Sequence, residues 1–116
     1  MMPKGRSGEE ERVYTQLLKI FQKKDIIRHC WNVIKRNNNA MELDFYLPKH
    51  NLAFEVDGPL HRIPRYGIDT LNYQKERDAF KDQECKRLNI ALIRVYAGHD
   101  VLEKIARVPI EYYAQL

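Results

Sequence analysis

The chain has few of the residues that characterise secreted, membrane or disordered proteins. Cys30 and Cys85 are its two cysteines among 116 residues, too few for a disulfide framework and not in zinc-type Cys/His spacing. No apolar run approaches the ~18 residues of a transmembrane helix, and the N-terminal MMPKGR has no apolar segment behind its charges. We therefore expect neither a membrane span nor a signal peptide. Five glycines, five prolines and 44% hydrophobic residues argue against a disordered or low-complexity chain.

The length fits one domain, because domains usually contain about 100–150 residues. We expect residues 1–8 to form a flexible basic arm and residues 9–116 a single domain. The formal charge of +4 permits a polyanionic partner such as nucleic acid but does not require one. Two reduced cysteines packed as small hydrophobes predict an intracellular protein, cytoplasmic or in the nucleoid or nucleus, and a phage or viral origin is compatible with this.

Hydrophobic periodicity and turn signals predict an α/β fold with a mixed central sheet flanked by helices. The elements expected are helices over 9–24, 69–89 and 101–107 and strands over 26–34, 41–47, 52–57 and 90–96. The run Lys35–Asn39 is a strong turn signal, and 58–68, with two prolines and two glycines, is expected to be a loop. The predicted order is α-β-β-β-α-β-α.

The most informative segment is 41–57, MELDFYLPKHNLAFEVD. If Pro48–Asn51 is a four-residue hairpin loop, paired positions sum to 99, so that Asp44 lies opposite Glu55 and Glu42 opposite Asp57. Side chains alternate in direction along a strand. One face then carries Met41, Leu43, Phe45, Leu47, Leu52, Phe54 and Val56, and the other carries Glu42, Asp44, Tyr46, Ala53, Glu55 and Asp57.

Four carboxylates on one face of a strand pair repel one another, so we expect a positive charge between them. A hard divalent cation fits, since Mg²⁺ binds one or two carboxylates and completes its shell with water and substrate phosphate. The competing interpretation is an ordinary strand that turns its polar residues to solvent.

Three more residues are candidates for the same site. Glu10 lies on the apolar stripe of the first helix, in line with Val13 and Leu17, and should face the sheet. His61 follows the second acidic strand and can act as an acid, base or ligand. Arg77 lies among apolar positions of the later helix, where it favours an anionic partner or extends along the surface.

Together these residues resemble the PD-(D/E)XK nuclease superfamily. The match comprises Glu10, Asp44, the run 54–61 (FEVDGPLH), Arg77-Asp78 and the strand 92–95 (LIRV), and it extends over nearly the whole chain. The nearest branch is that of the very-short-patch-repair (Vsr-like) endonucleases and their small EDxHD-type homing relatives. The resemblance implies a restriction-endonuclease-like core and a Mg²⁺- or Mn²⁺-dependent DNA endonuclease without an organic cofactor.

Specific roles also follow from the resemblance. Asp44 and Glu55 would bind the metal, with the Val56 carbonyl as a further ligand, and Glu10 would act through water or a second metal. Asp57 stands where the superfamily usually has lysine, so His61 would complete the site together with Asp57. Lys75 or Lys81 on the later helix are alternatives for the missing lysine.

Basic residues around the site would track a nucleic-acid backbone. The candidates are Lys4, Arg6, Lys35, Arg36, Arg62, Arg65, Lys75 and Arg77. Tyr66 and Trp31 are candidates for base stacking, although core packing is the default expectation for Trp31. The apolar C-terminal residues, Ile110, Tyr112, Tyr113 and Leu116, would pack on the core or form a homodimer contact.

The leading hypothesis is therefore a DNA endonuclease that hydrolyses phosphodiesters with a metal-activated water. Nicking and site- or structure-specific cleavage both fit, and RNA is not excluded as substrate. The alternative is a non-catalytic nucleic-acid-binding module with a degenerate nuclease fold, which the missing lysine would explain.

Overall fold

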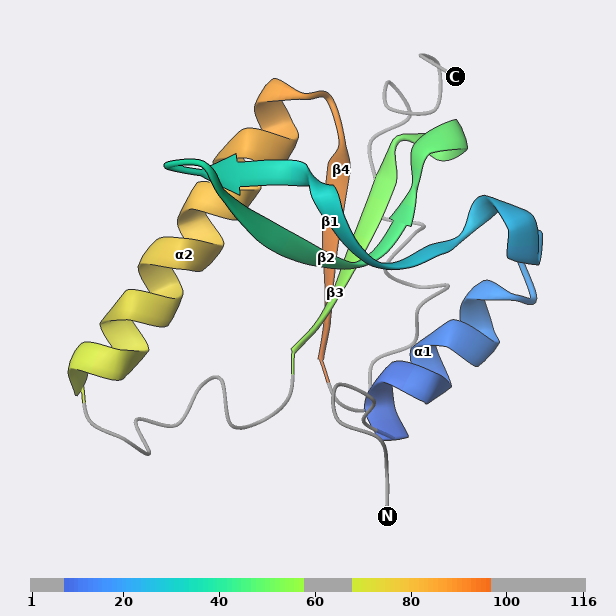
Figure 1. Cartoon of the computed structure of the whole chain (residues 1–116). Helices are drawn as coiled ribbons and strands as arrows, with labels where there is room; N and C mark the ends of the chain where they lie inside the picture. The colour runs from blue at the N-terminus through green and yellow to red at the C-terminus, as the bar shows by residue number, and fades with distance from the viewer. Residues whose placement is uncertain (1–7, 58–67, 97–116) are drawn as a thin grey trace.

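A computed structural model describes residues 8–57 and 68–96 (Figure 1). The helices are α1 (Gly8–Leu17) and α2 (Ile68–Arg87), with short 3-10 turns η1 (Lys23–Asp25) and η2 (Pro48–His50). The strands are β1 (Ile27–Arg36), β2 (Asn39–Leu47), β3 (Leu52–Asp57) and β4 (Ala91–Tyr96). Residues 1–7 of the expected basic arm, residues 58–67 of the expected loop and the expected helix over 101–107 lie outside the described residues. Gly8 and Ile68, expected in the arm and the loop, are instead the first residues of α1 and α2.

The four strands form one mixed sheet, as the sequence predicted, and they lie in the order β1-β2-β3-β4 (Figure 1). β1, β2 and β3 run antiparallel, whereas β4 lies parallel to β3. Neighbouring residues of β3 show that the helices cover opposite faces. Phe54 packs in a core cluster with Val13 and Leu17 of α1, whereas Glu55 contacts Lys81 of α2. The result is an α/β sandwich with a helix on each side.

Two asparagines form the turn between β1 and β2. Asn37 and Asn38 have φ of 51° and 68°, and Arg36 pairs with Asn39 across the turn. Positive φ at both central residues is the geometry of a type I′ hairpin, which asparagine tolerates. The predicted turn over Lys35–Asn39 is therefore confirmed, with β1 continuing to Arg36.

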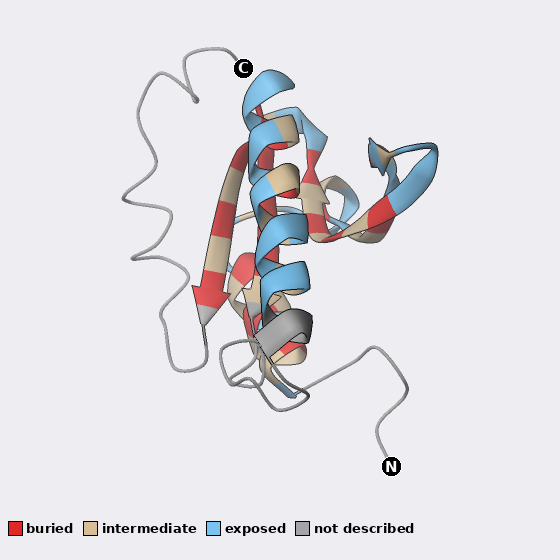
Figure 2. Ribbon diagram, turned by 90° about the vertical axis from the view of Figure 1, so that its left-hand side faces the viewer, coloured by how far each residue is buried: buried red, intermediate tan, exposed pale blue. Residues whose placement is uncertain are grey.

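The register between β2 and β3 is the predicted one. Phe45 pairs with Phe54 and Leu47 with Leu52, so paired positions sum to 99. The residues of the predicted apolar face are buried apart from Val56, which is partly buried. They do not form one cluster, however: Phe45, Leu47, Leu52 and Phe54 pack with α1, whereas Met41 and Leu43 pack with Ala53 and with Cys85 of α2. Figure 2 shows the resulting alternation of buried and intermediate residues along the strands and the exposed outer side of α2.

The first helix is shorter than predicted. It ends at Leu17 rather than near residue 24. The amides of Ile20 and Phe21 both donate to the Leu17 carbonyl, at 3.0 and 2.8 Å, in a turn that closes the helix. Phe21 leaves the helical path and packs on His50, with ring centroids 4.8 Å apart, while Ile20 is exposed. The apolar stripe therefore continues in the sequence after the helix itself has ended.

The second helix and the strand after it follow the prediction closely. α2 ends in a Schellman-type cap, in which Ile90 N–H donates to the Cys85 carbonyl (2.8 Å) and Asn89 N–H to that of Lys86 (3.1 Å). Asn89 has φ 64° and occupies the left-handed position that glycine usually fills. Cys85 and Cys30 are both buried and free, as expected. Neither described helix combines the length and apolarity of a membrane span.

β1 contains an irregularity that the sequence did not indicate. Between the pairs Cys30–Leu43 and Ile34–Met41, β1 has three residues where β2 has Glu42 alone. Just before this bulge, His29 has φ 52°. Bulges re-aim side chains and are common next to functional sites. This bulge leaves Trp31 54% exposed, so the default expectation of a core tryptophan was wrong.

The hairpin turn gives a stability prediction. Asn38→Val should lower the free energy of unfolding by about 1–2 kcal/mol, because a β-branched residue is strained at positive φ. Asn38→Gly should change it by less than about 0.5 kcal/mol. Urea unfolding would measure both, with the strand variant Asn39→Val as control. Equal stability of the Val and Gly variants would contradict the assigned turn.

Candidate functional site

The acidic strand residues line an open pocket of about 350 Å³ between the sheet and the two helices. Its lining residues are Glu10, Trp31, Met41, Glu42, Asp44, Glu55, Val56, Gln74, Arg77, Asp78 and Lys81. These residues come from α1, α2 and the strands β1, β2 and β3. Five carboxylates and two cationic side chains therefore converge in one cavity.

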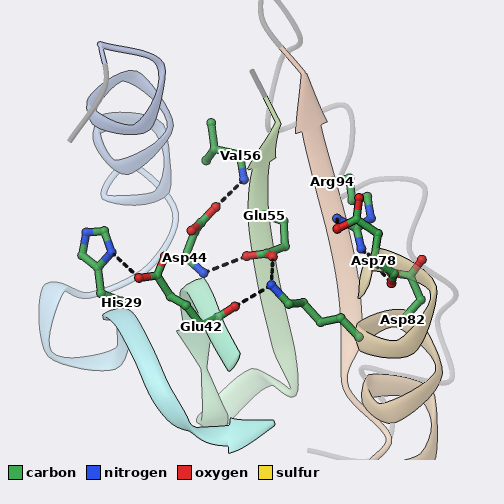
Figure 3. Close-up of polar contacts among 9 residues, drawn as sticks. His29, Glu42, Asp44, Glu55, Val56, Asp78, Asp82 and Arg94 are labelled. Carbon is green, nitrogen blue, oxygen red and sulfur yellow. Dashed lines mark hydrogen bonds and ion pairs between the residues drawn. The ribbon is translucent and has the colours of Figure 1, made fainter. Parts of the chain in front are cut away.

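Asp44 and Glu55 are locked to each other's strands (Figure 3). The backbone N–H of Asp44 donates to Glu55 Oε2 at 2.8 Å, and the N–H of Val56 donates to Asp44 Oδ2 at 2.8 Å. Backbone pairing between β2 and β3 is present at Phe45–Phe54, and these reciprocal side-chain bonds take over beyond it. The carboxylates thus satisfy backbone donors and have fixed orientations.

Lys81 supplies a positive charge beside the two acidic strands, where the sequence predicted a divalent cation. This α2 side chain is buried, and its ammonium forms an ion pair with Glu55 Oε1. It also donates to the Glu42 carbonyl at 2.6 Å. A buried lysine without such partners would lose its proton. A single lysine thereby connects α2 to both acidic strands.

Asp44 has the most strongly perturbed pKa among the carboxyl groups of the pocket. Burial, the neighbouring Glu55 carboxylate and a hydrogen bond with Glu42 raise the pKa of Asp44 to about 9. The Val56 N–H opposes this shift but does not overcome it. The folded protein therefore favours a protonated Asp44 near neutral pH, and a bound cation would favour its ionised form instead.

On the other side of the pocket, His29 bridges two acids from different elements. Its Nε2 lies 2.9 Å from Glu10 Oε1 and its Nδ1 lies 3.2 Å from Glu42 Oε2. Glu10 is 7% exposed, as its predicted inward position requires. Arg28 lies 3.5 Å from the Glu10 carboxylate and stacks over the Tyr14 ring at 4.2 Å. The N-terminal part of α1 is therefore fixed to the edge of the site.

The structure brings together part of the predicted residue set. Glu10, Asp44, Glu55, Val56 and Arg77 line the pocket. Arg36 lines an adjoining pocket, which Arg77 shares. Lys35 and Lys75 are exposed and line neither pocket.

The remaining predicted residues cannot be assigned to the pocket. His61, Arg62, Arg65 and Tyr66 lie outside the described residues, as does the side chain of Asp57.

The donor set fits a lightly coordinated metal rather than a closed metal cage. Among residues 8–57 and 68–96, no group of three or more His, Cys, Asp and Glu side chains is arranged to hold a metal ion. Two adjacent carboxylates with excess negative charge suit Mg²⁺, which keeps several waters and accepts phosphate oxygens. The pKa of Asp44 is raised first by burial and then by the neighbouring Glu55 carboxylate, so a cation bound here would displace the Asp44 proton.

His29 was missed because its role depends on the β1 bulge, which has no sequence signature. Lys81 was considered only as an alternative, although α2 carries a usable signal. Gln74, Asp78, Lys81 and Cys85 have spacings of four, three and four residues, which place them on one helix face. A lysine on a face that also carries a buried cysteine indicates a paired, inward-facing charge.

Comparisons of the chain with protein-family models, curated proteins and solved structures gave no match.

The pKa of Asp44 predicts how stability depends on pH. Between about pH 4 and about pH 9 the unfolded chain has lost the proton that folded Asp44 retains, so the free energy of unfolding should fall as pH rises. Asp44→Asn removes this dependence and keeps an acceptor for the Val56 N–H. We expect its Tm near pH 8, in a chelator, to exceed that of the wild type by several degrees, at about 4 °C per kcal/mol.

Thermal unfolding across this pH range tests the prediction. Asp82→Asn is the matched control, since Asp82 is exposed and pairs with Arg94 outside the pocket. A wild-type Tm that does not change between pH 5 and pH 9 would contradict the raised pKa.

Proposed function

We propose that this protein is a divalent-metal-dependent nuclease that hydrolyses phosphodiester bonds. The observation that carries the proposal is the pairing of Asp44 and Glu55 on adjacent strands, with buried Lys81 in contact with Glu55. Two adjacent carboxylates can hold the cation that metal-assisted phosphodiester hydrolysis requires, and a lysine beside them matches the pattern of the superfamily that the sequence resembles. The resemblance to the PD-(D/E)XK superfamily, in its Vsr-like branch, leads to the same reaction class.

In this proposal Asp44 and Glu55 hold Mg²⁺ or Mn²⁺, with the Val56 carbonyl as a further ligand. The cation, when bound, offsets charge on the phosphate and makes a coordinated water more acidic. The reciprocal backbone bonds keep both carboxylates in place, so little reorganisation accompanies binding. Glu10, held by His29 and Arg28, orients water at the edge of the site.

In the superfamily a strand lysine orients the nucleophile, but this sequence has Asp57 at that position. In this proposal Lys81 of α2 takes the role instead. Two of the three ammonium donors contact Glu55 and the Glu42 carbonyl among the described residues, so a third can reach a water or a phosphate oxygen. Lys75, the other helix candidate, is exposed and does not line the pocket. Lys81 is therefore the better candidate for orienting the nucleophile.

DNA is the proposed substrate. A pocket with five carboxylates repels phosphate unless a metal and flanking cations reverse the local sign. Arg77 on the wall of the pocket and Arg36 beside it can supply part of that positive charge.

Cleavage assays with carboxylate variants test the proposal. Asp44→Ala and Glu55→Gln should each lower plasmid or oligonucleotide cleavage in Mn²⁺ by about 100-fold or more, since each removes a metal ligand. Glu84→Gln is the control, because Glu84 pairs with Arg87 on the exposed side of α2. Equal cleavage by all four proteins, or none by wild type on linear, branched and mismatched substrates, would overturn the proposal.

Lys81→Met separates the lysine's role from metal binding. Removal of a cation next to Glu55 should tighten Mn²⁺ binding measured by calorimetry, whereas the cleavage rate should fall by about 10²–10³-fold. Lys75→Met is the matched control and should change neither quantity by more than about twofold. Unchanged cleavage by Lys81→Met would remove Lys81 from the mechanism.

The alternative function is a nucleic-acid-binding module without catalysis. It is favoured if DNA binds tightly while Mn²⁺ binding is absent or is unaffected by Asp44→Ala.

A further inference from the structure

A second pocket adjoins the acidic one. It has a volume of about 320 Å³ and is lined by Arg36, Asn37, Asn39, Ala40, Met41, Tyr73 and Arg77. Met41 and Arg77 line both pockets, so the two cavities lie side by side along a path between the β1–β2 hairpin and α2. We call this path the hairpin groove, comprising the second pocket together with Trp31 on the wall of the first.

The two pockets have opposite charge. Five carboxylates line the first, whereas the second has two arginines and no acidic lining residue. Arg36 also pairs with Glu76 at 2.5 Å, but Glu76 is 63% exposed, and such surface pairs contribute little and can exchange for a phosphate. A polyanionic chain therefore fits the second pocket and can extend toward a metal held in the first.

Two aromatic side chains lie exposed along the same path. Trp31 is 54% exposed on the wall of the first pocket, and Tyr73 is 59% exposed on that of the second. Arg77 lies 5.9 Å from the Tyr73 ring centroid, in cation–π contact. Aromatic rings beside arginines are how proteins bind unpaired nucleotides, because bases stack on the rings while phosphates meet the cations.

The strand must be unpaired to use these rings. In a duplex the faces of each base are covered by its neighbours, and exposing one costs unstacking energy. Each pocket is also only as large as a small-molecule site. Exposed rings next to side-chain-sized cavities therefore favour bases that are already free of pairing.

We propose that the hairpin groove binds a single-stranded segment of nucleic acid, with a base stacked on Trp31 and phosphates at Arg36 and Arg77. This inference rests on the proposed function. If the protein is a nuclease, its substrate is DNA with an unpaired segment next to the scissile phosphate, such as a flap, gap or branch. The binding itself requires no metal and is tested separately.

Trp31 is the single tryptophan of the chain, so its fluorescence reports directly on the groove. Full-length protein in a chelator is titrated with a single-stranded oligonucleotide of about 12 nucleotides and with a blunt duplex of the same sequence. Quenching by the single strand at a lower concentration than by the duplex is expected. Equal quenching by both, or quenching by neither, would overturn the proposal.

Variants show whether stacking carries the affinity. Trp31→Ala and Tyr73→Ala should each weaken single-strand binding, measured by anisotropy of a labelled oligonucleotide, by about 5- to 150-fold. Trp31→Phe should retain most of the affinity. Leu18→Ala, at an exposed apolar position outside both pockets, is the control. Unchanged affinity in both alanine variants would overturn the proposal that the hairpin groove binds a single strand.

The two proposals can fail separately. If Asp44→Ala abolishes cleavage while Trp31→Ala binds and cleaves flap substrates like the wild type, the nuclease stands and the groove is wrong. If wild type never cleaves but its tryptophan is quenched by single strands and Trp31→Ala loses affinity, the groove stands and the nuclease is wrong.

Discussion

The site is built around two adjacent carboxylates on neighbouring strands, of which Glu55 is buried and Asp44 is partly buried. Asp44 and Glu55 would destabilise an ordinary strand pair, since like charges opposite each other repel. The protein offsets this with two backbone N–H donors and with Lys81 of α2. Because α2 provides the compensating ammonium, its position relative to β2 and β3 is fixed by electrostatics as well as by packing. The pKa of Asp44 remains high because its carboxyl is desolvated and lies beside that of Glu55.

Apolar packing on the other face of the same strands stabilises the fold against the cost of the charged pocket. Phe45, Leu47, Leu52 and Phe54 are fully buried in a cluster that includes α1. Burial of these side chains contributes about 1.5–3 kcal/mol each, which offsets the cost of a charged, partly buried pocket on the reverse side. The same helix carries Glu10 to the pocket edge, so α1 serves both the core and the site.

The small net charge of the chain results from positive and negative groups that lie in separate pockets. The net charge of +4 is the sum over a chain that has an acidic pocket next to a basic one. Arg77 lines both pockets. An acidic pocket alone repels a phosphate chain, and a basic groove alone binds one without reacting. Their adjacency supports a division of work in which the groove holds a strand and the carboxylates hold a cation beside it. The proposed nuclease and the proposed single-strand groove are therefore linked but physically distinct.

The sequence by itself determined the local and periodic features. Alternation along 41–57 predicted which apolar residues are buried and the register from Phe45–Phe54 to Leu47–Leu52, because side-chain direction in a hairpin depends on position and loop length. It also predicted that Asp44 and Glu55 lie close together, and each carboxylate accepts a backbone N–H from the other strand. Helical spacing predicted the inward position of Glu10. Tertiary structure decided the rest. The end of α1 follows from the packing of Phe21, and the roles of His29 and Trp31 follow from a bulge that alternation does not encode. The choice of Lys81 over Lys75 depends on how α2 lies across the sheet, a long-range contact that no local pattern specifies.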